Sequence, residues 1–116
     1  MVAKPKAKPP ENLMSKVFSM AGMVDIQADA VVSRTVVSKK AGTVTLFAFD
    51  KGQGLSTHSA PYDALVWILA GAVAITIDGK KLRAKTGDMV LMPANHPHAL
   101  KALQPFKMAL VMIKEK

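Results

Sequence analysis

Short apolar segments separated by turn residues run along most of the chain, and none of them has a clean helical period. Residues 31–38 and 43–49 are rich in β-branched and aromatic side chains, which are enriched in strands. The stretch from Lys39 to Gly42 separates them. The pattern predicts two strands joined by a short turn.

The clearest hairpin signal lies in the middle of the chain. Residues 73–77 alternate between large apolar and smaller or polar side chains, up to Asp78 and Gly79. Aspartate followed by glycine is typical of a two-residue type I′ turn, because both residues tolerate a positive φ angle. Residues 80–85 are therefore predicted to return as the partner strand.

Two further segments, 64–71 and 106–114, are apolar on both faces of the strand that each is predicted to form. One face of the second segment carries Phe106, Met108, Leu110 and Met112. A strand that packs on a core with one face only would leave about half of such a segment in water. We therefore expect a second copy of the chain to cover the outer surface, in a homodimer.

The remaining segments complete an all-β pattern. Residues 52–61 are predicted to be a bent, partly looped segment that leads into a strand, 86–88 a turn, and 89–93 another strand. Residues 13–24 are predicted to form a short strand or an irregular arm. Some eight short strands without a helix favour a single-domain antiparallel β-barrel or double-sheet jelly roll over residues 13–116.

Composition narrows the class of protein. The chain has 116 residues, half of them hydrophobic, which suits one domain with one core. No apolar run approaches the ~18 residues of a membrane-spanning helix, and the Lys- and Pro-rich residues 1–12 are predicted to be a disordered tail rather than a signal peptide. The lack of cysteine excludes disulfides and thiolate sites. We expect a cytoplasmic protein.

The formal net charge is +8, of which the three lysines and one glutamate of the tail account for +2. Many of the other basic residues lie in or beside predicted turns: Lys39, Lys40, Lys80, Lys81, Arg83 and Lys85. Aromatic residues make up 5% of the chain, so few side chains could stack on nucleic-acid bases. We interpret the charge as solvated surface, and a nucleic-acid-associated regulator is the least favoured function.

Two motifs give the chain a resemblance to the cupin superfamily. The first cupin motif, G-x5-H-x-H-x3-E-x6-G, falls on Gly52, His58, Ala60, Ala64 and Gly71. The second, G-x5-P-x-G-x2-H-x3-N, falls on Gly87, Pro93, Asn95, His98 and Ala102. The resemblance covers roughly residues 35–113 without gaps. It implies a small β-barrel, commonly dimeric, with an interior pocket that often holds a divalent metal.

The resemblance is incomplete at the metal ligands. Metal-binding members of the family use two histidines and a glutamate of the first motif and the histidine of the second. This chain keeps His58 and His98, but it has Ala60 and Ala64 in the other two positions. Because alanine has no donor atom, half of the implied ligand set is missing.

Asp63 and His96 are the neighbouring candidates for a third ligand. Asp63 precedes the vacant glutamate position, so it should point to the opposite face of its strand unless a bulge turns it inward. His96 is separated from His98 by Pro97 and is expected at the mouth of the pocket. A metal-dependent enzyme of the oxygenase or isomerase type, with zinc, nickel, iron, manganese or copper, stays an alternative that would use His58, His98 and one of these two.

The leading hypothesis is a small cytoplasmic cupin that binds a small organic molecule in its interior. His58 and His98 would supply the polar contacts, as proton donors or acceptors. The alternative for the same pair is two interior histidines bonded to backbone or water, without chemistry. The two alanines should make the pocket larger and more apolar than that of a metal-loaded relative. Further residues expected in the pocket are Trp67, Tyr62, Met89 and Met92.

Overall fold

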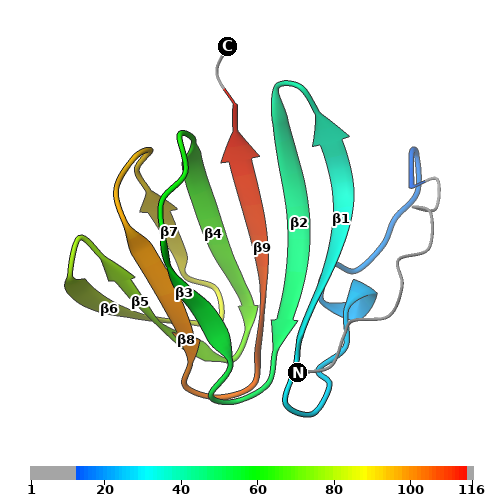
Figure 1. The fold of residues 1–116 in the computed structure, drawn as a ribbon. Coiled ribbons are helices and arrows are strands. Elements are labelled where there is room, and N and C mark those ends of the chain that lie inside the picture. Colours follow the sequence, from blue (N-terminus) through cyan, green and yellow to red (C-terminus); the bar gives the residue numbers. More distant parts are fainter. Residues whose placement is uncertain (1–12, 115–116) are drawn as a thin grey trace.

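The computed structural model describes residues 13–114, which form an all-β protein (Figure 1). The strands of this part of the chain are β1 (Val31–Lys39), β2 (Gly42–Phe49), β3 (Gly54–His58), β4 (Asp63–Ala70), β5 (Ala72–Ile77), β6 (Lys80–Lys85), β7 (Met89–Met92), β8 (His98–Ala102) and β9 (Phe106–Ile113). One short 3-10 helix, η1 (Ala21–Met23), precedes β1. No helix among the described residues has the length and apolar character that crossing a membrane requires.

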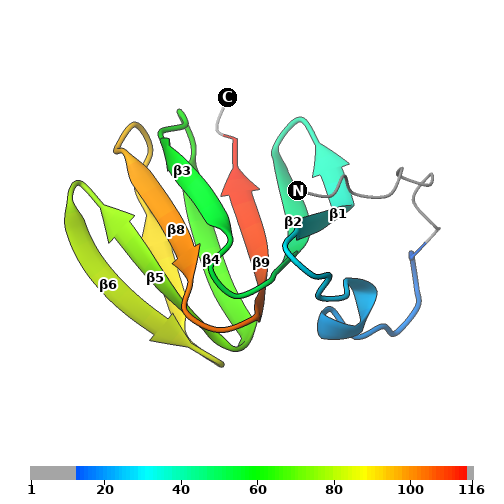
Figure 2. The same cartoon turned by 60° about the horizontal axis from the view of Figure 1, so that its bottom comes forward.

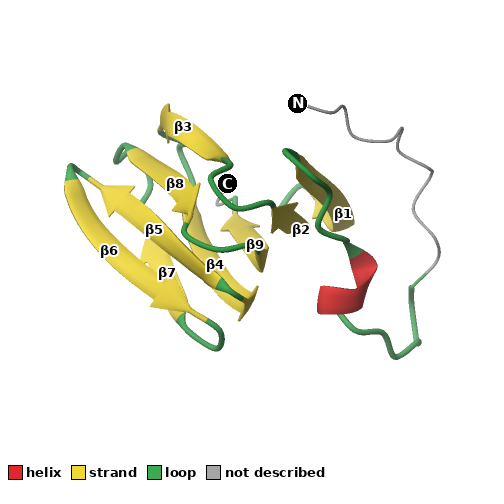
Figure 3. Ribbon diagram, turned by 90° about the horizontal axis from the view of Figure 1, so that it is seen from below, coloured by secondary structure: helices red, strands yellow, loops and turns green. Residues whose placement is uncertain are grey.

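The strands form two antiparallel sheets that face each other (Figures 1 and 3). Sheet A has the strand order β1-β2-β9-β4-β7, and sheet B has the order β3-β8-β5-β6. The strand pairs of both sheets are antiparallel. This two-layer arrangement confirms the predicted all-β class and its double-sheet jelly-roll form.

The central hairpin forms as the sequence predicts. Strands β5 and β6 pair in continuous register down to Ile77 opposite Lys80. The two residues between them, Asp78 and Gly79, have φ angles of 53° and 80°. Two successive positive φ angles are the signature of a type I′ turn, whose twist matches that of the flanking strands. The hairpin completes one edge of sheet B.

The sequence pattern predicts some eight strands, and β8 is the additional strand that it misses. It lies between β3 and β5 in sheet B. His98, Leu100 and Ala102 are buried, whereas Ala99 and Lys101 are more exposed. The strand is short and follows a proline, and its outer positions are alanine and lysine, so its alternation is easily missed in the sequence.

The main core lies between the two sheets. Its largest fully buried side chains are Phe49, Phe106, Ile68, Met108 and Val66 from sheet A, and Val73 and Ile75 from sheet B. The rings of Phe49 and Phe106 stack across β2 and β9, with centroids 4.5 Å apart and planes 8° from parallel. Burying one such side chain stabilises a fold by about 1.5–3 kcal/mol. The core therefore holds the two sheets packed against each other.

Three crossings between the sheets meet around Gly71. This residue alone joins β4 in sheet A to β5 in sheet B, with a φ angle of 95°. Its amide donates a hydrogen bond to Thr86 Oγ1 (3.0 Å), where β6 crosses to β7. A Cβ atom on Gly71 would collide with the Pro105 carbonyl and lie 2.6 Å from the Cβ of Phe106, where β8 crosses to β9. Only glycine allows this approach.

A second apolar cluster covers part of the outer face of sheet A. Residues 20–26 pack on Leu46, Ala48 and Ala109, whose side chains point away from the main core. Figure 2 shows η1 beside β1 and β2, at the edge of the sheet. The N-terminal arm thus shields one part of the outer face of sheet A, a sheet that contains the two segments predicted to be apolar on both faces.

The arm that leads to β1 is irregular apart from η1. This outcome agrees with the irregular alternative predicted for residues 13–24. Lys107 ties the arm to sheet A, because its Nζ donates a hydrogen bond to the Ala21 carbonyl (2.7 Å). The predicted tail, residues 1–12, lies outside the described residues.

We predict that Gly71→Ala lowers the free energy of unfolding much more than Gly79→Ala. Both glycines have a positive φ angle, which costs an alanine about 1–2 kcal/mol. Gly79 has open space around an added Cβ, whereas Gly71 would also overlap backbone atoms, for a total of about 3–5 kcal/mol. Urea unfolding followed by Trp67 fluorescence measures both, and equal losses would contradict the close approach at Gly71.

Candidate functional site

Two histidines from neighbouring strands of sheet B meet at the end of the molecule opposite Gly71. His58 is the last residue of β3 and His98 is the first of β8, and the two are partners in register. Their ring centroids lie 4.5 Å apart, with the planes inclined by 69°. The structure thus brings together the two residues that the sequence analysis assigns to one site.

A β-bulge in β3 sets the direction of His58. Leu55 pairs with Leu100 and His58 pairs with His98, so three steps along β3 match two steps along β8. The extra residue keeps His58 on the same side of the sheet as Leu55, which packs against the main core. Without the bulge, the alternation of side chains would turn His58 to the outer side.

Each imidazole is oriented by a backbone carbonyl. The Nδ1 of His58 lies 2.9 Å from the Ser56 oxygen, and the Nδ1 of His98 lies 3.2 Å from the His96 oxygen. A carbonyl can only accept, so each Nδ1 carries a proton and donates it. In a neutral ring, Nε2 then keeps its lone pair. The pair therefore offers two acceptor nitrogens from adjacent rings.

His98 is the more enclosed of the two rings. His98 is buried, with 7% of its surface exposed, whereas His58 lies at the surface. Burial lowers the pKa of His98 below its ordinary value of 6.5, because the charged ring loses its hydration. The hydrogen bond to the His96 carbonyl opposes this shift, and the charge of His58 adds to it. The His98 ring is consequently neutral at pH 7.

Two loops at this end are tied together beside the histidine pair. The β7–β8 loop donates to the β3–β4 loop through a hydrogen bond from Asn95 N to the Ala60 oxygen (2.7 Å). Asp63 Oδ1 accepts a second one from Ala94 N (2.8 Å). Asn95 has a φ angle of 67°, a left-handed conformation that asparagine tolerates better than most residues. These bonds fix both loops that flank the pair.

The donor set at this end does not fit a transition-metal site. Across residues 13–114, no three His, Cys, Asp or Glu side chains come together as metal ligands. His96 is exposed, and its Nδ1 lies 2.7 Å from Asp78 Oδ2 in the β5–β6 turn. Asp63 is engaged with Ala94 N. Two imidazoles fall short of the three or four protein ligands that a stable site requires.

The other predicted residues of this end belong to packing or to the loops. Ala64 and Met92 are cross-strand partners on the inner face of sheet A, and both are buried in the main core. Ala60 lies in the β3–β4 loop. Tyr62, in the same loop, is half-buried, and Lys114 Nζ lies 5.6 Å from the centroid of its ring. Ordinary core packing therefore fills the position that a metal-binding glutamate would occupy.

Trp67 and Met89 lie on the outer face of sheet A, not in the interior where the sequence analysis expects them. They are cross-strand partners and are 36% and 54% exposed. Ala64, Val66 and Ile68 of β4 are buried in the main core, so the alternation along the strand turns Trp67 outward. A strand that is apolar on both faces does not reveal in its sequence which face is inside.

One half-buried residue at this end, whose hydroxyl oxygen is buried, carries no signal in the sequence. Thr43, near the start of β2, pairs with Met112, which in turn pairs with Ala64. Thr43 and Phe47 are four residues apart in β2, so their side chains point to the same face of the strand. Because Phe47 packs on the main core, the side chain of Thr43 faces the interior. Within residues 13–114, its Oγ1 is the one buried side-chain nitrogen or oxygen without a hydrogen-bond partner. No sequence signal distinguishes it from Thr45.

Comparison with known proteins gives a family and a set of similar folds. The sequence model of the cupin domain matches residues 45–114. No curated protein matches the chain. A crystal structure of a conserved protein of unknown function from Streptococcus pyogenes is 40% identical, with a TM-score of 0.85 over 96% of this chain and 99% of that one.

Two further solved structures agree with this similarity. A cupin 2 conserved barrel domain protein from Leptotrichia buccalis is 39% identical, with a TM-score of 0.82 over 84% of this chain and 47% of that one. A cupin superfamily protein from Desulfitobacterium hafniense is 25% identical, with a TM-score of 0.84 over 93% of this chain and all of that one.

We predict that stability falls with acidification below about pH 6.5 and that His98→Gln flattens this dependence. The unfolded chain, in which His98 titrates near 6.5, takes up a proton before the folded protein does. The contribution of His98 to the free energy of unfolding is therefore complete above pH 6.5, and it is lost as the pH falls toward the lowered pKa. Urea titrations from pH 8 to pH 5 measure it, with NMR titration of the ring. A folded-state pKa at or above 6.5 would contradict the prediction.

Proposed function

The chain belongs to the cupin domain family, and from this premise we propose that it binds a small organic molecule between its sheets, at the end that carries His58 and His98. The observation that carries the proposal is the contact between the two imidazoles, each oriented by a backbone carbonyl. A hydrogen bond at one ring nitrogen fixes the tautomer and the direction of the other nitrogen, as in rings used for binding.

The class of ligand follows from which nitrogen of each ring donates to the backbone. Each Nδ1 donates to a carbonyl, so a neutral His58 or His98 can only accept a hydrogen bond at Nε2. Burial keeps His98 in that neutral state by lowering its pKa. A ligand with two hydroxyl donors matches the two acceptors, and the apolar core beside them suits a hydrocarbon portion. We therefore favour an uncharged hydroxylated compound over an anion.

Thr43 supports the same assignment. An unsatisfied buried hydroxyl costs about 1–3 kcal/mol, and such groups in native proteins usually have a reason. The hydroxyl of Thr43 lies on the inner face of sheet A, at the end where the histidines lie on sheet B. A hydroxylated ligand would supply the missing partner, which makes Thr43 a third candidate contact.

The proposal ends at binding and includes no metal-dependent step. An oxygenase or isomerase of the metal-dependent type would need a third ligand beside His58 and His98. His96 is engaged by Asp78, and Asp63 is engaged by the β7–β8 loop. With both candidates held elsewhere, the geometry supports a binding protein better than a metalloenzyme.

We also infer that the protein is a homodimer formed through the outer face of sheet A. Large apolar side chains are exposed there, beyond the part that the arm covers: Val37, Trp67, Met89, Leu91 and Ile113. The outer face of β7 and residues 65–69 of β4 carry no charged side chain there. A second copy presents the same uncharged face, so a two-fold contact would cover apolar surface with apolar surface. Monomers rarely leave such a patch in water.

We predict that at least one neutral sugar, polyol or hydroxylated aromatic compound raises the melting temperature of the dialysed protein. A ligand that binds only the folded state stabilises it in proportion to ln(1 + [L]/Kd). His58→Ala and Thr43→Val should each weaken the binding of that compound by about tenfold, because each removes one hydrogen bond. A panel of such compounds in a thermal-shift assay, followed by calorimetry on the compound that binds, measures both effects.

His96→Ala is the matched control, since its ring is held by Asp78 and should leave affinity unchanged. Thr43→Val should also keep or raise the free energy of unfolding of the unliganded protein, because it removes an unsatisfied buried hydroxyl. If no compound of the panel stabilises the protein and the His58 and Thr43 variants behave as the parent does, the proposed pocket is wrong.

We predict that Leu91→Lys converts the dimer into a monomer. Leu91 is 71% exposed on the outer face of β7, so a lysine there should be tolerated by the fold while it places two like charges in the interface. Gln104→Lys adds the same charge at an exposed residue of the β8–β9 turn and should leave the dimer intact. Light scattering after gel filtration gives both masses. A monomeric parent protein would refute the interface.

A further inference from the structure

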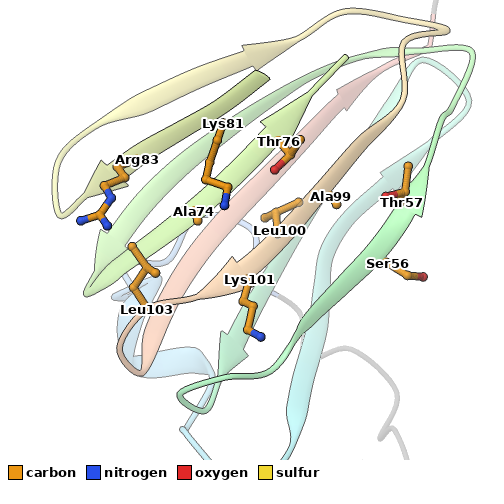
Figure 4. Close-up of a pocket in the computed structure, with 10 residues that line it drawn as sticks. All are labelled: Ser56, Thr57, Ala74, Thr76, Lys81, Arg83, Ala99, Leu100, Lys101 and Leu103. Carbon is orange, nitrogen blue, oxygen red and sulfur yellow. The ribbon is translucent and has the colours of Figure 1, made fainter. Parts of the chain in front are cut away.

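A groove of about 480 Å³ crosses the outer face of sheet B (Figure 4). Ala99 and Lys101 of β8 line it, whereas His98 and Ala102 of the same strand are buried on the opposite face. The sheet itself therefore separates this groove from the histidine pair. The outer face of sheet A, which we assign to the dimer contact, lies on the other side of the molecule and leaves the groove open.

Three basic side chains stand along the groove: Lys81 and Arg83 from β6, and Lys101 from β8. Ala74 of β5 is the cross-strand partner of both Arg83 and Lys101, so two cations flank one alanine. No lining residue is acidic. Among the described residues, none of the three cations forms an ion pair or hydrogen bond with another side chain. Their charge is therefore available to a ligand.

The floor between the cations is made of small side chains. Ala74, Thr76 and Ala99 lie on β5 and β8 between the basic residues, so a ligand can approach the sheet closely. Hydroxyl groups of Thr76 and Thr57 add hydrogen-bond donors to the lining. Arginine matches the oxygens of phosphate and carboxylate groups with two parallel hydrogen bonds, and lysine adds a point charge. Every polar element of the groove thus suits an anion.

We propose that this groove binds a small organic anion that carries two phosphate or carboxylate groups. Strands in a sheet lie about 4.8 Å apart, so the backbones of Arg83 and Lys101 are separated by roughly 10 Å, and Lys81 lies about 6.7 Å from Arg83 along β6. Two linked anionic groups would engage both flanks with the side chains extended, whereas one compact anion would require the cations to converge on a single point. The volume falls within the ~300–1,000 Å³ that is common for small-molecule sites.

A small ligand fits the groove better than a single-stranded nucleic acid does. Proteins that bind single strands combine a basic track with aromatic side chains on which the bases stack. No aromatic residue lines this groove. The lining includes three basic residues, which suits recognition of a few anionic groups.

The test is calorimetry at about 20 mM NaCl, with inorganic pyrophosphate and citrate as probes. At least one probe should bind the full-length protein, and Arg83→Gln and Lys101→Gln should each weaken that binding by about tenfold. Lys40→Gln removes the same charge from the exposed β1–β2 turn, outside the groove, and should change the affinity less than twofold. Amide shifts in NMR spectra should concentrate at Thr76 and Ala99.

Three results would overturn the proposal. The first is the absence of binding by both probes at millimolar concentration. The second is an equal loss of affinity in the Lys40 and Arg83 variants, which would show a response to net charge only. The third is a six-residue thymidine oligonucleotide that binds tighter than both probes with the same dependence on Arg83, which would make the groove a nucleic-acid surface. Circular dichroism checks that each variant is folded.

Discussion

The close approach at Gly71 is the constraint on which the rest of the molecule depends. One residue carries the chain from sheet A to sheet B there, and it does so against the backbone of two other crossings, at Thr86 and at Pro105. A side chain at this point would push the layers apart at the place where Phe106 begins the central strand of sheet A. The histidine pair lies at the opposite end of the sheets, away from this constraint.

Much of the architecture could be predicted from local patterns. The alternation in β5, the Asp78–Gly79 turn and the apolar run of β9 each identify an element without knowledge of the others. The inner and outer faces could not be assigned in the same way. In β4 both faces are apolar, and only the packing of Val66 against sheet B shows that Trp67 points outward. That information comes from contacts between segments that are distant in the sequence.

In the candidate site, too, the sequence predicts which residues lie together but not which partners hold the other candidates. The spacing of glycines and histidines predicted that His58 and His98 share a site, and the rings are in contact. The partners of the other candidates could not be foreseen, because the engagement of His96 depends on a turn 18 residues away in the chain. The buried hydroxyl of Thr43 carries no sequence signal at all, since its isolation is a property of the folded interior.

The bulge in β3 makes one short stretch of chain serve two surfaces. Thr57 lines the outer groove, and the next residue, His58, meets His98 on the other side. In a regular strand, odd and even positions point to opposite faces. The additional residue of the bulge reverses this assignment for the residues that follow it. Regular pairing of the same residues, without the bulge, would instead place the Thr57 hydroxyl inside the molecule and turn the His58 imidazole outward. The bulge therefore determines which side chain, imidazole or hydroxyl, each face of the sheet displays.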